Sequence, residues 1–197
     1  GMLATVINSL ALQQGFEEVG AEAVVMTAID MERIADPFTQ RDAVKHLENG
    51  KIVIFGGGTG CPYFSTDTGA VLRAAEINAD AVLMAKNIDG VYTADPRICK
   101  NAYKLDDISY DEMLELASLG ANVLHNRSVE MAKKYNVKMS VRSSLNNNEG
   151  TYVKEESQVE KMLVRGVTRD NDCARIALCG VEDAPGKECQ VFEMIAK

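Results

Sequence analysis

Tryptophan is absent from this 197-residue chain, and histidine and proline are scarce, with two and four residues. The five cysteines contain no C-x-x-C pair, which argues against a disulfide framework or a zinc site and favours a reducing compartment. We therefore expect the cysteines to be small buried hydrophobic residues. No apolar run is long enough to cross a bilayer, and the first residues lack the basic segment of a secretory signal. These absences predict a cytoplasmic protein without a membrane partner.

Positive charge is also in short supply. Lys and Arg total 21 against 29 Asp and Glu, which gives a net charge of −8. A surface this acidic repels phosphate backbones, so we expect no nucleic-acid partner. A nucleotide ligand is still compatible with this charge, because local backbone amides can hold phosphate against an unfavourable overall field.

The sequence does contain a regular alternation of helical and strand patterns. Helices are expected over residues 3–19, 37–47, 66–77, 109–117 and 126–135 and strands over 23–26, 51–55, 81–84 and 137–141. The helix at 109–117 opens with Ser109 and Glu112, the S-x-x-E pattern of a capping box. This alternation predicts an α/β fold in which helices cover both faces of a mostly parallel sheet.

A glycine-rich run, Gly56–Gly60, follows the expected strand at 51–55. The run fits neither standard phosphate-loop template, because no Lys follows it and Cys61 occupies a position that would require Gly. Glycine nevertheless lets the backbone approach a ligand, and Ser65 and Thr66 lie at a helix N-terminus that favours an anion. A tight turn with an ordinary helix cap is the alternative. The position at the carboxyl end of a strand favours a ligand site.

A second loop, Lys86–Arg97, follows the expected strand at 81–84. Tyr92 can pack on a base, Asp95 can accept a hydrogen bond from a ribose, and the two cations can neutralise phosphate. The alternative from the pattern alone is a solvated loop with an Asp-Gly turn. Both loops follow the carboxyl ends of strands, so we expect the two loops to face each other.

Specific motifs identify relatives of the two halves of the chain. Three stretches, Met2–Val6, Gly58–Thr68 and Asp89–Pro96, are typical of bacterial UMP kinase, which residues 2–103 resemble. Two others, Leu119–Glu130 and Val141–Ser144, are typical of aspartokinase, which residues 89–197 resemble. Both families belong to the amino-acid kinase superfamily and share the D-G-V-Y-x-A-D-P motif where the resemblances overlap. The chain therefore looks like a chimera of two related genes.

The resemblance implies the three-layer α/β/α architecture of the amino-acid kinase (carbamate kinase-like) fold. Residues 1–153 would form a partial kinase domain, and the charged residues 154–172 a hinge with one strand at 162–167. Residues 173–197 resemble the first strand and helix of an ACT domain, the unit that binds the feedback amino acid in aspartokinases. Both families begin with a strand, a Gly-rich loop and a Lys. The resemblance of this chain starts after the position of that segment, so we expect the chain to be truncated at its N-terminus.

The resemblance to UMP kinase also implies an activity, the Mg²⁺-dependent transfer of phosphate from ATP to UMP. The acceptor loop would comprise Thr59, Gly60, Cys61, Pro62, Tyr63, Phe64, Ser65 and Thr66. ATP would be bound by Lys86, Tyr92 and Asp95. Arg97 would add positive charge to neutralise the phosphates. No catalytic residue and no metal ligand is assigned. Cys61 stands where UMP kinases usually carry Asn. His125 falls near the position of a catalytic Asp of that family, although we expect the His125 side chain to be satisfied by local hydrogen bonds.

Other functions remain open. Aspartokinase, which phosphorylates aspartate on the route to lysine, threonine and methionine, is favoured by the second half, although Cys61–Asp67 replaces that family's aspartate-holding stretch. An inactive nucleotide-binding or assembly module is the alternative of another class. We expect no measurable turnover by this chain alone, because the Gly-rich loop and Lys that hold the transferred group would precede it. Lys51 should lie at the opposite edge of the sheet. The incomplete sheet and ACT unit predict self-association.

Overall fold

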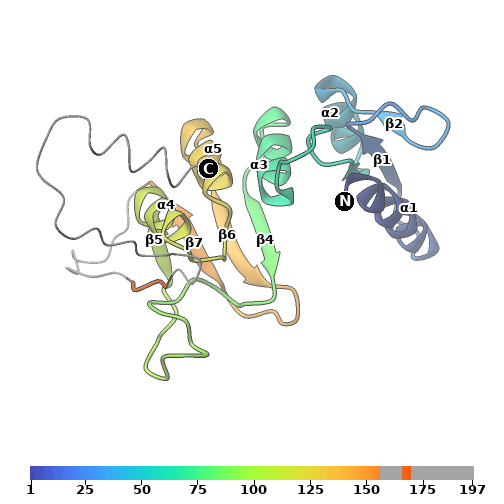
Figure 1. Ribbon diagram of the computed structural model, residues 1–197. Coiled ribbons are helices and arrows are strands. Elements are labelled where there is room, and N and C mark those ends of the chain that lie inside the picture. The colour runs from blue at the N-terminus through green and yellow to red at the C-terminus, as the bar shows by residue number, and fades with distance from the viewer. Residues whose placement is uncertain (156–165, 170–197) are drawn as a thin grey trace, which may run out of the picture.

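The computed structural model describes residues 1–155 and 166–169, which form an α/β structure with two sheets (Figure 1). The first sheet has the order β2-β1-β3 and the second the order β4-β6-β7-β5. Their strands are β1 (Ala23–Thr27), β2 (Asp36–Pro37), β3 (Ile52–Gly56), β4 (Val82–Lys86), β5 (Asp107–Ser109), β6 (Met139–Ser143) and β7 (Thr151–Lys154). Every pair is parallel except β6 with β7. The predicted α/β class with a mostly parallel arrangement is confirmed, and the hydrogen bonds divide its strands into two sheets.

Five helices in the described residues pack against these sheets. In the first part, α1 (Met2–Glu18) contacts β1 and β3, and α2 (Gln40–Glu48) contacts β3. In the second part, α3 (Thr66–Glu76) contacts β4, α4 (Tyr110–Ser118) contacts β5, and α5 (Asn126–Tyr135) lies between α3 and α4 (Figure 1). The main hydrophobic core belongs to this second part.

The burial of β4 shows which face of the second sheet carries that core. Val82 and Met84 are 8% and 5% exposed and join a cluster that includes Met113 and Val129 of the helices. The intervening Leu83 is 64% exposed. This alternation places the helix layer over one face of β4, since successive side chains of a strand point to opposite faces.

Local sequence signals explain where the helices begin. Ser109 and Glu112 form both hydrogen bonds of the predicted capping box at the start of α4. Thr39 caps α2 by accepting a hydrogen bond from the Asp42 amide. Pro37 was expected inside this helix but lies in β2, where the fixed φ of proline suits extended backbone.

Besides β2, the strands β5 and β7 were not predicted. They are three and four residues long and pair with each other across more than forty residues, so no local pattern marks them. Lys154, the first residue of the predicted hinge, is the last residue of β7. The predicted ACT-like unit at 173–197 and most of the strand predicted at 162–167 lie outside the described residues. Within the described part, the Val167 amide donates to the Thr93 carbonyl at 2.8 Å.

Two further properties bear on the predictions. Cys61 and Cys99 are exposed, so the expectation of buried cysteines is wrong at these positions. Both lie in loops that project from the sheets, where no apolar layer covers them. Among the described residues, no helix combines the length and the apolar character needed to cross a membrane.

Candidate functional site

The glycine-rich loop turns sharply at the carboxyl end of β3. Gly57, Gly58 and Gly60 have φ values of +77°, +61° and +78°, a left-handed conformation that favours glycine. A Cβ atom at Gly60 would lie 2.7 Å from the Ala28 carbonyl oxygen. The loop is therefore packed against the segment that follows β1. Arg73 of α3 fixes it from the other side by donating to the Gly58 carbonyl at 3.3 Å.

The predicted acceptor residues form the rest of this loop and the start of α3. Ser65 caps the helix, its Oγ accepting from the Thr68 amide at 3.1 Å. Thr59 hydrogen-bonds through its Oγ1 to the backbone of Cys61 at 3.3 Å. Tyr63 is 97% exposed and Phe64 50% exposed. The loop thus offers aromatic side chains and a capped helix N-terminus to solvent.

Three segments meet at Asp67, in the first turn of α3. The Lys86 ammonium, at the end of β4, donates to both Asp67 carboxylate oxygens at 2.7 and 2.8 Å. The His125 backbone amide, at the start of α5, donates to Asp67 Oδ2 at 3.2 Å. The Asp67 and Lys86 side chains are 15% and 27% exposed. Lys86 thereby offsets the carboxylate at a helix end whose dipole attracts anions.

His125 has the local role expected from the sequence. It caps α5, and its Nδ1 accepts a hydrogen bond from the Arg127 amide at 3.3 Å. The side chain is exposed. Its contribution to the site comes through the backbone amide that contacts Asp67.

The other three residues predicted to bind ATP are held within their own loop. The Tyr92 hydroxyl donates to Asp89 Oδ1 at 2.9 Å, and this hydrogen bond raises the pKa of the phenol because it favours the protonated form. Asp95 accepts from Arg97 Nε at 3.0 Å and from its terminal nitrogen at 2.9 Å. The guanidinium lowers the pKa of the Asp95 carboxyl. Within the described contacts, Lys86 joins the acceptor-loop helix rather than these three residues.

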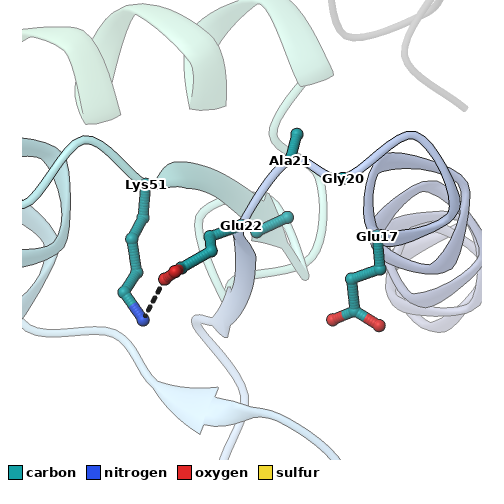
Figure 2. Close-up of a pocket in the computed structure, with 6 residues that line it drawn as sticks. Glu17, Gly20, Ala21, Glu22 and Lys51 are labelled. Carbon is teal, nitrogen blue, oxygen red and sulfur yellow. Dashed lines mark ion pairs between the residues drawn. The ribbon is translucent and has the colours of Figure 1, made fainter.

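A shallow pocket lies at the amino-terminal ends of β1 and β3, which is the end of the first sheet opposite to the glycine-rich loop (Figure 2). Lys51 lies just before β3 and forms an ion pair with Glu22, just before β1, at 3.0 Å. The glycine-rich loop leaves β3 from its other end. The prediction that Lys51 lies away from the ligand loops is therefore confirmed for the glycine-rich loop.

Sequence reasoning selected Lys86 but assigned no role to Asp67. The two residues are nineteen positions apart, and nothing in either local pattern marks them as a pair. An acidic residue in the first turn of a helix is also common for reasons of helix stability alone. Among the described residues, no group of three or more His, Cys, Asp and Glu side chains is arranged to hold a metal ion.

Comparisons with known proteins agree on one family. Residues 1–143 match the family model described as the amino acid kinase family. The UMP kinase of Bacillus anthracis is similar with 35% identity and a TM-score of 0.74, over 80% of this chain and 68% of that one. The UMP kinase of Ureaplasma parvum has 31% identity and a TM-score of 0.72, over 79% and 69% of the two chains. The aspartate kinase of Synechocystis has 34% identity and a TM-score of 0.63, over 80% of this chain but 28% of that one.

Proposed function

The chain belongs to the amino acid kinase family, and we propose that it carries the nucleotide and acceptor sites of an ATP-dependent phosphotransferase whose acceptor is UMP. The observation that carries this proposal is the contact between Lys86 and Asp67, which joins the end of β4 to the start of α3. The loop Thr59–Thr66 ends at the start of α3 and the second loop begins at Lys86, so this cation stands between the end of one loop and the beginning of the other. Positive charge placed at the transferred group stabilises the transition state of phosphoryl transfer.

The similarity to UMP kinases supports UMP as the acceptor. This chain spans 68% and 69% of the two UMP kinases but 28% of the aspartate kinase, and the TM-scores are higher for the UMP kinases. In our proposal the loop Thr59–Thr66 holds UMP, whose phosphate lies at the α3 N-terminus. Backbone amides in the first turn of a helix favour such a group.

Tyr92, Asp95 and Arg97 form the ATP side of the proposed site. Tyr92 offers a ring to the base, and the Asp95–Arg97 pair offers an acceptor to the ribose and a cation to the phosphates. Mg²⁺, when bound with the triphosphate, neutralises phosphate charge. Lys86 lies between the two loops and would stabilise charge on the transferred group.

We expect binding to be easier to detect than turnover. Lys86 and Arg97 supply the positive side chains of the two loops, and each already pairs with a carboxylate. Their net contribution to stabilising the charge that is redistributed over the transferred group in the transition state is reduced accordingly. An ADP-release assay with Mg²⁺, run with UMP and separately with aspartate, measures what turnover remains.

Isothermal titration calorimetry with UMP and with Mg-ATP tests the proposed sites. Lys86→Met should weaken both ligands about 10- to 100-fold, the effect of losing a hydrogen bond to a charged group. Asp95→Ala should weaken ATP and leave UMP unchanged. Lys51→Met is the matched control, because it breaks a comparable ion pair with Glu22 at the other edge of the sheet and should change neither affinity.

The same measurements separate the alternatives. The 34% identity to an aspartate kinase makes that activity the second candidate, and aspartate-dependent ADP release would replace UMP by aspartate as the acceptor. ATP binding without turnover on either acceptor is the behaviour of a nucleotide-binding module. A chain that binds neither UMP nor ATP contradicts the proposal.

A further inference from the structure

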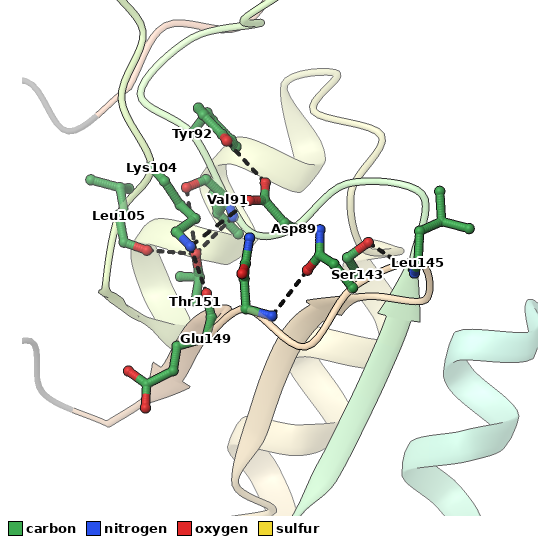
Figure 3. Close-up of polar contacts among 11 residues, drawn as sticks. Asp89, Val91, Tyr92, Lys104, Leu105, Ser143, Leu145, Glu149 and Thr151 are labelled. Atoms are coloured by element: carbon green, nitrogen blue, oxygen red, sulfur yellow. Dashed lines mark hydrogen bonds and ion pairs between the residues drawn. The ribbon is translucent and has the colours of Figure 1, made fainter.

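Thr151, the first residue of β7, is completely buried, with 0% of its surface exposed. Figure 3 shows its hydroxyl between two backbone segments. Oγ1 accepts a hydrogen bond from the Val91 amide at 2.7 Å and donates one to the Leu105 carbonyl at 2.6 Å. A hydroxyl has one proton to donate and lone pairs to accept, so both bonds form at once.

Val91 and Leu105 are the two ends of one loop. The Leu105 amide donates to the Val91 carbonyl at 2.8 Å, and the next residues inward, Tyr92 and Lys104, form an antiparallel bridge. The loop between these ends contains Tyr92, Asp95 and Arg97, all assigned above to the ATP side. Thr151 therefore ties the start of the loop to its end from outside it.

The packing around this hydroxyl is close. Gly90 has a φ of +156°, and a Cβ atom there would lie 2.7 Å from Thr151 Oγ1. Lys104 donates to the Glu149 carbonyl, just before β7, at 2.5 Å, and its Nζ lies 3.9 Å from Asp89 Oδ2. Asp89 in turn accepts from the Tyr92 hydroxyl. The contacts made near Thr151 thus continue to the proposed base-binding ring.

We propose that Thr151 is a positioning residue of the nucleotide site: its hydroxyl holds the loop 91–105 in the shape that presents Tyr92 and Asp95 to ATP. This inference rests on the proposed function. Thr151→Val keeps the shape of the side chain but leaves the Val91 amide and the Leu105 carbonyl without this partner in a buried place, which is costly. Thr151→Ser keeps the hydroxyl and should restore both bonds.

The experiment measures four properties of each variant: amide hydrogen exchange over residues 91–105, ATP affinity, UMP affinity and melting temperature. Thr151→Val should speed exchange in the loop and weaken ATP about tenfold, with UMP affinity retained. Thr151→Ser should bind ATP as the parent does. Ser9→Ala is the control, since it removes a buried hydroxyl that donates to the Thr5 carbonyl in α1. It should lower the melting temperature without changing ATP affinity.

The affinities of the parent and the variants distinguish a failure of the positioning role from a failure of the proposed function. The inference is overturned if the parent binds ATP and Thr151→Val binds it equally well, or if Thr151→Ser binds as weakly as Thr151→Val. Equal losses of ATP and UMP affinity in Thr151→Val would also overturn it, because they indicate general destabilisation. A parent chain that fails to bind ATP overturns the proposed function and the positioning role together.

Discussion

At the scale of single residues, two glycines of the same loop differ in what surrounds them. Gly58 and Gly60 both have a left-handed backbone conformation, with φ of +61° and +78°. A Cβ atom at Gly58 would meet no atom within 4 Å, whereas one at Gly60 would meet the Ala28 carbonyl at 2.7 Å. The two positions therefore separate the cost of backbone conformation from the cost of close packing.

Gly60→Ala should destabilise the protein more than Gly58→Ala. Both substitutions place a side chain in the left-handed region, at a cost of about 1–2 kcal/mol. Only Gly60→Ala must also move the loop away from Ala28, so it should in addition weaken UMP binding. Urea unfolding and calorimetry with UMP measure the two effects. Equal effects of the two substitutions would show that the contact with Ala28 is unimportant.

At the scale of elements, α3 organises the glycine-rich loop through a buried cation. Arg73 is 8% exposed and forms an ion pair with Glu76 in the next turn. Its guanidinium lies 3.9 Å from the centre of the Phe38 ring and donates to the Gly58 carbonyl. The helix α3 begins where the acceptor loop ends, and through Arg73 it also contacts Gly58 near the start of the glycine-rich loop. The same side chain links this loop to Phe38, in the segment before α2.

The start of α4 is anchored by Tyr110, which is 3% exposed and donates its hydroxyl to the Val137 carbonyl at 2.8 Å. Tyr110→Phe should lower the free energy of unfolding at pH 7 by about 1–3 kcal/mol, because a buried carbonyl loses its partner. Burial raises the pKa of the Tyr110 phenol, with a smaller effect from the charge of Glu155. A raised pKa in the folded state means that this contribution is present below about pH 10 and is lost as pH rises through the folded-state value.

The difference between parent and Tyr110→Phe should therefore shrink in alkaline solution. Urea unfolding of both proteins between pH 7 and 11 measures it, and Tyr135→Phe, at a half-exposed tyrosine, is the control. A constant difference across this range would contradict the role given to burial.

At the scale of the whole molecule, α1 exposes apolar side chains on the side away from the sheet. Val6 is 2% exposed, while Leu3 and Ile7, four residues apart on one face, are 61% and 67% exposed. No charged residue occurs between Met2 and Phe16 in a chain of net charge −8. Exposed apolar side chains that lie together on a surface often mark a site of contact with another protein. Because like charges repel elsewhere on the surface, this uncharged face favours contact between copies.

We expect the protein to self-associate in a way that depends on α1. Ile7→Lys should lower the average mass in sedimentation velocity at micromolar concentration, because it places a charge within the apolar face. Leu145→Lys is the control, since Leu145 is 82% exposed on a loop far along the chain. A parent chain that sediments as a monomer, or an Ile7→Lys variant with the mass of the parent, would contradict this expectation.

The sequence by itself determined the local features: the α/β alternation, the capping box at Ser109, the glycine-rich turn after β3 and the two strand-end loops. These depend on side-chain period, cap chemistry and glycine conformation, all of which act within a few residues. The short strands β5 and β7 and the division into two sheets could not be predicted, since their partners lie far along the chain.

Only the tertiary structure decided how the candidate site is held together. The partners of Asp67 lie nineteen residues away at Lys86 and fifty-eight away at His125, and Thr151 lies sixty residues from Val91. Nothing in the local sequence encodes these pairings. They arise because folding brings together the ends of β4, α3 and α5, and separately places the start of β7 against the loop that follows β4, where buried polar groups must find partners.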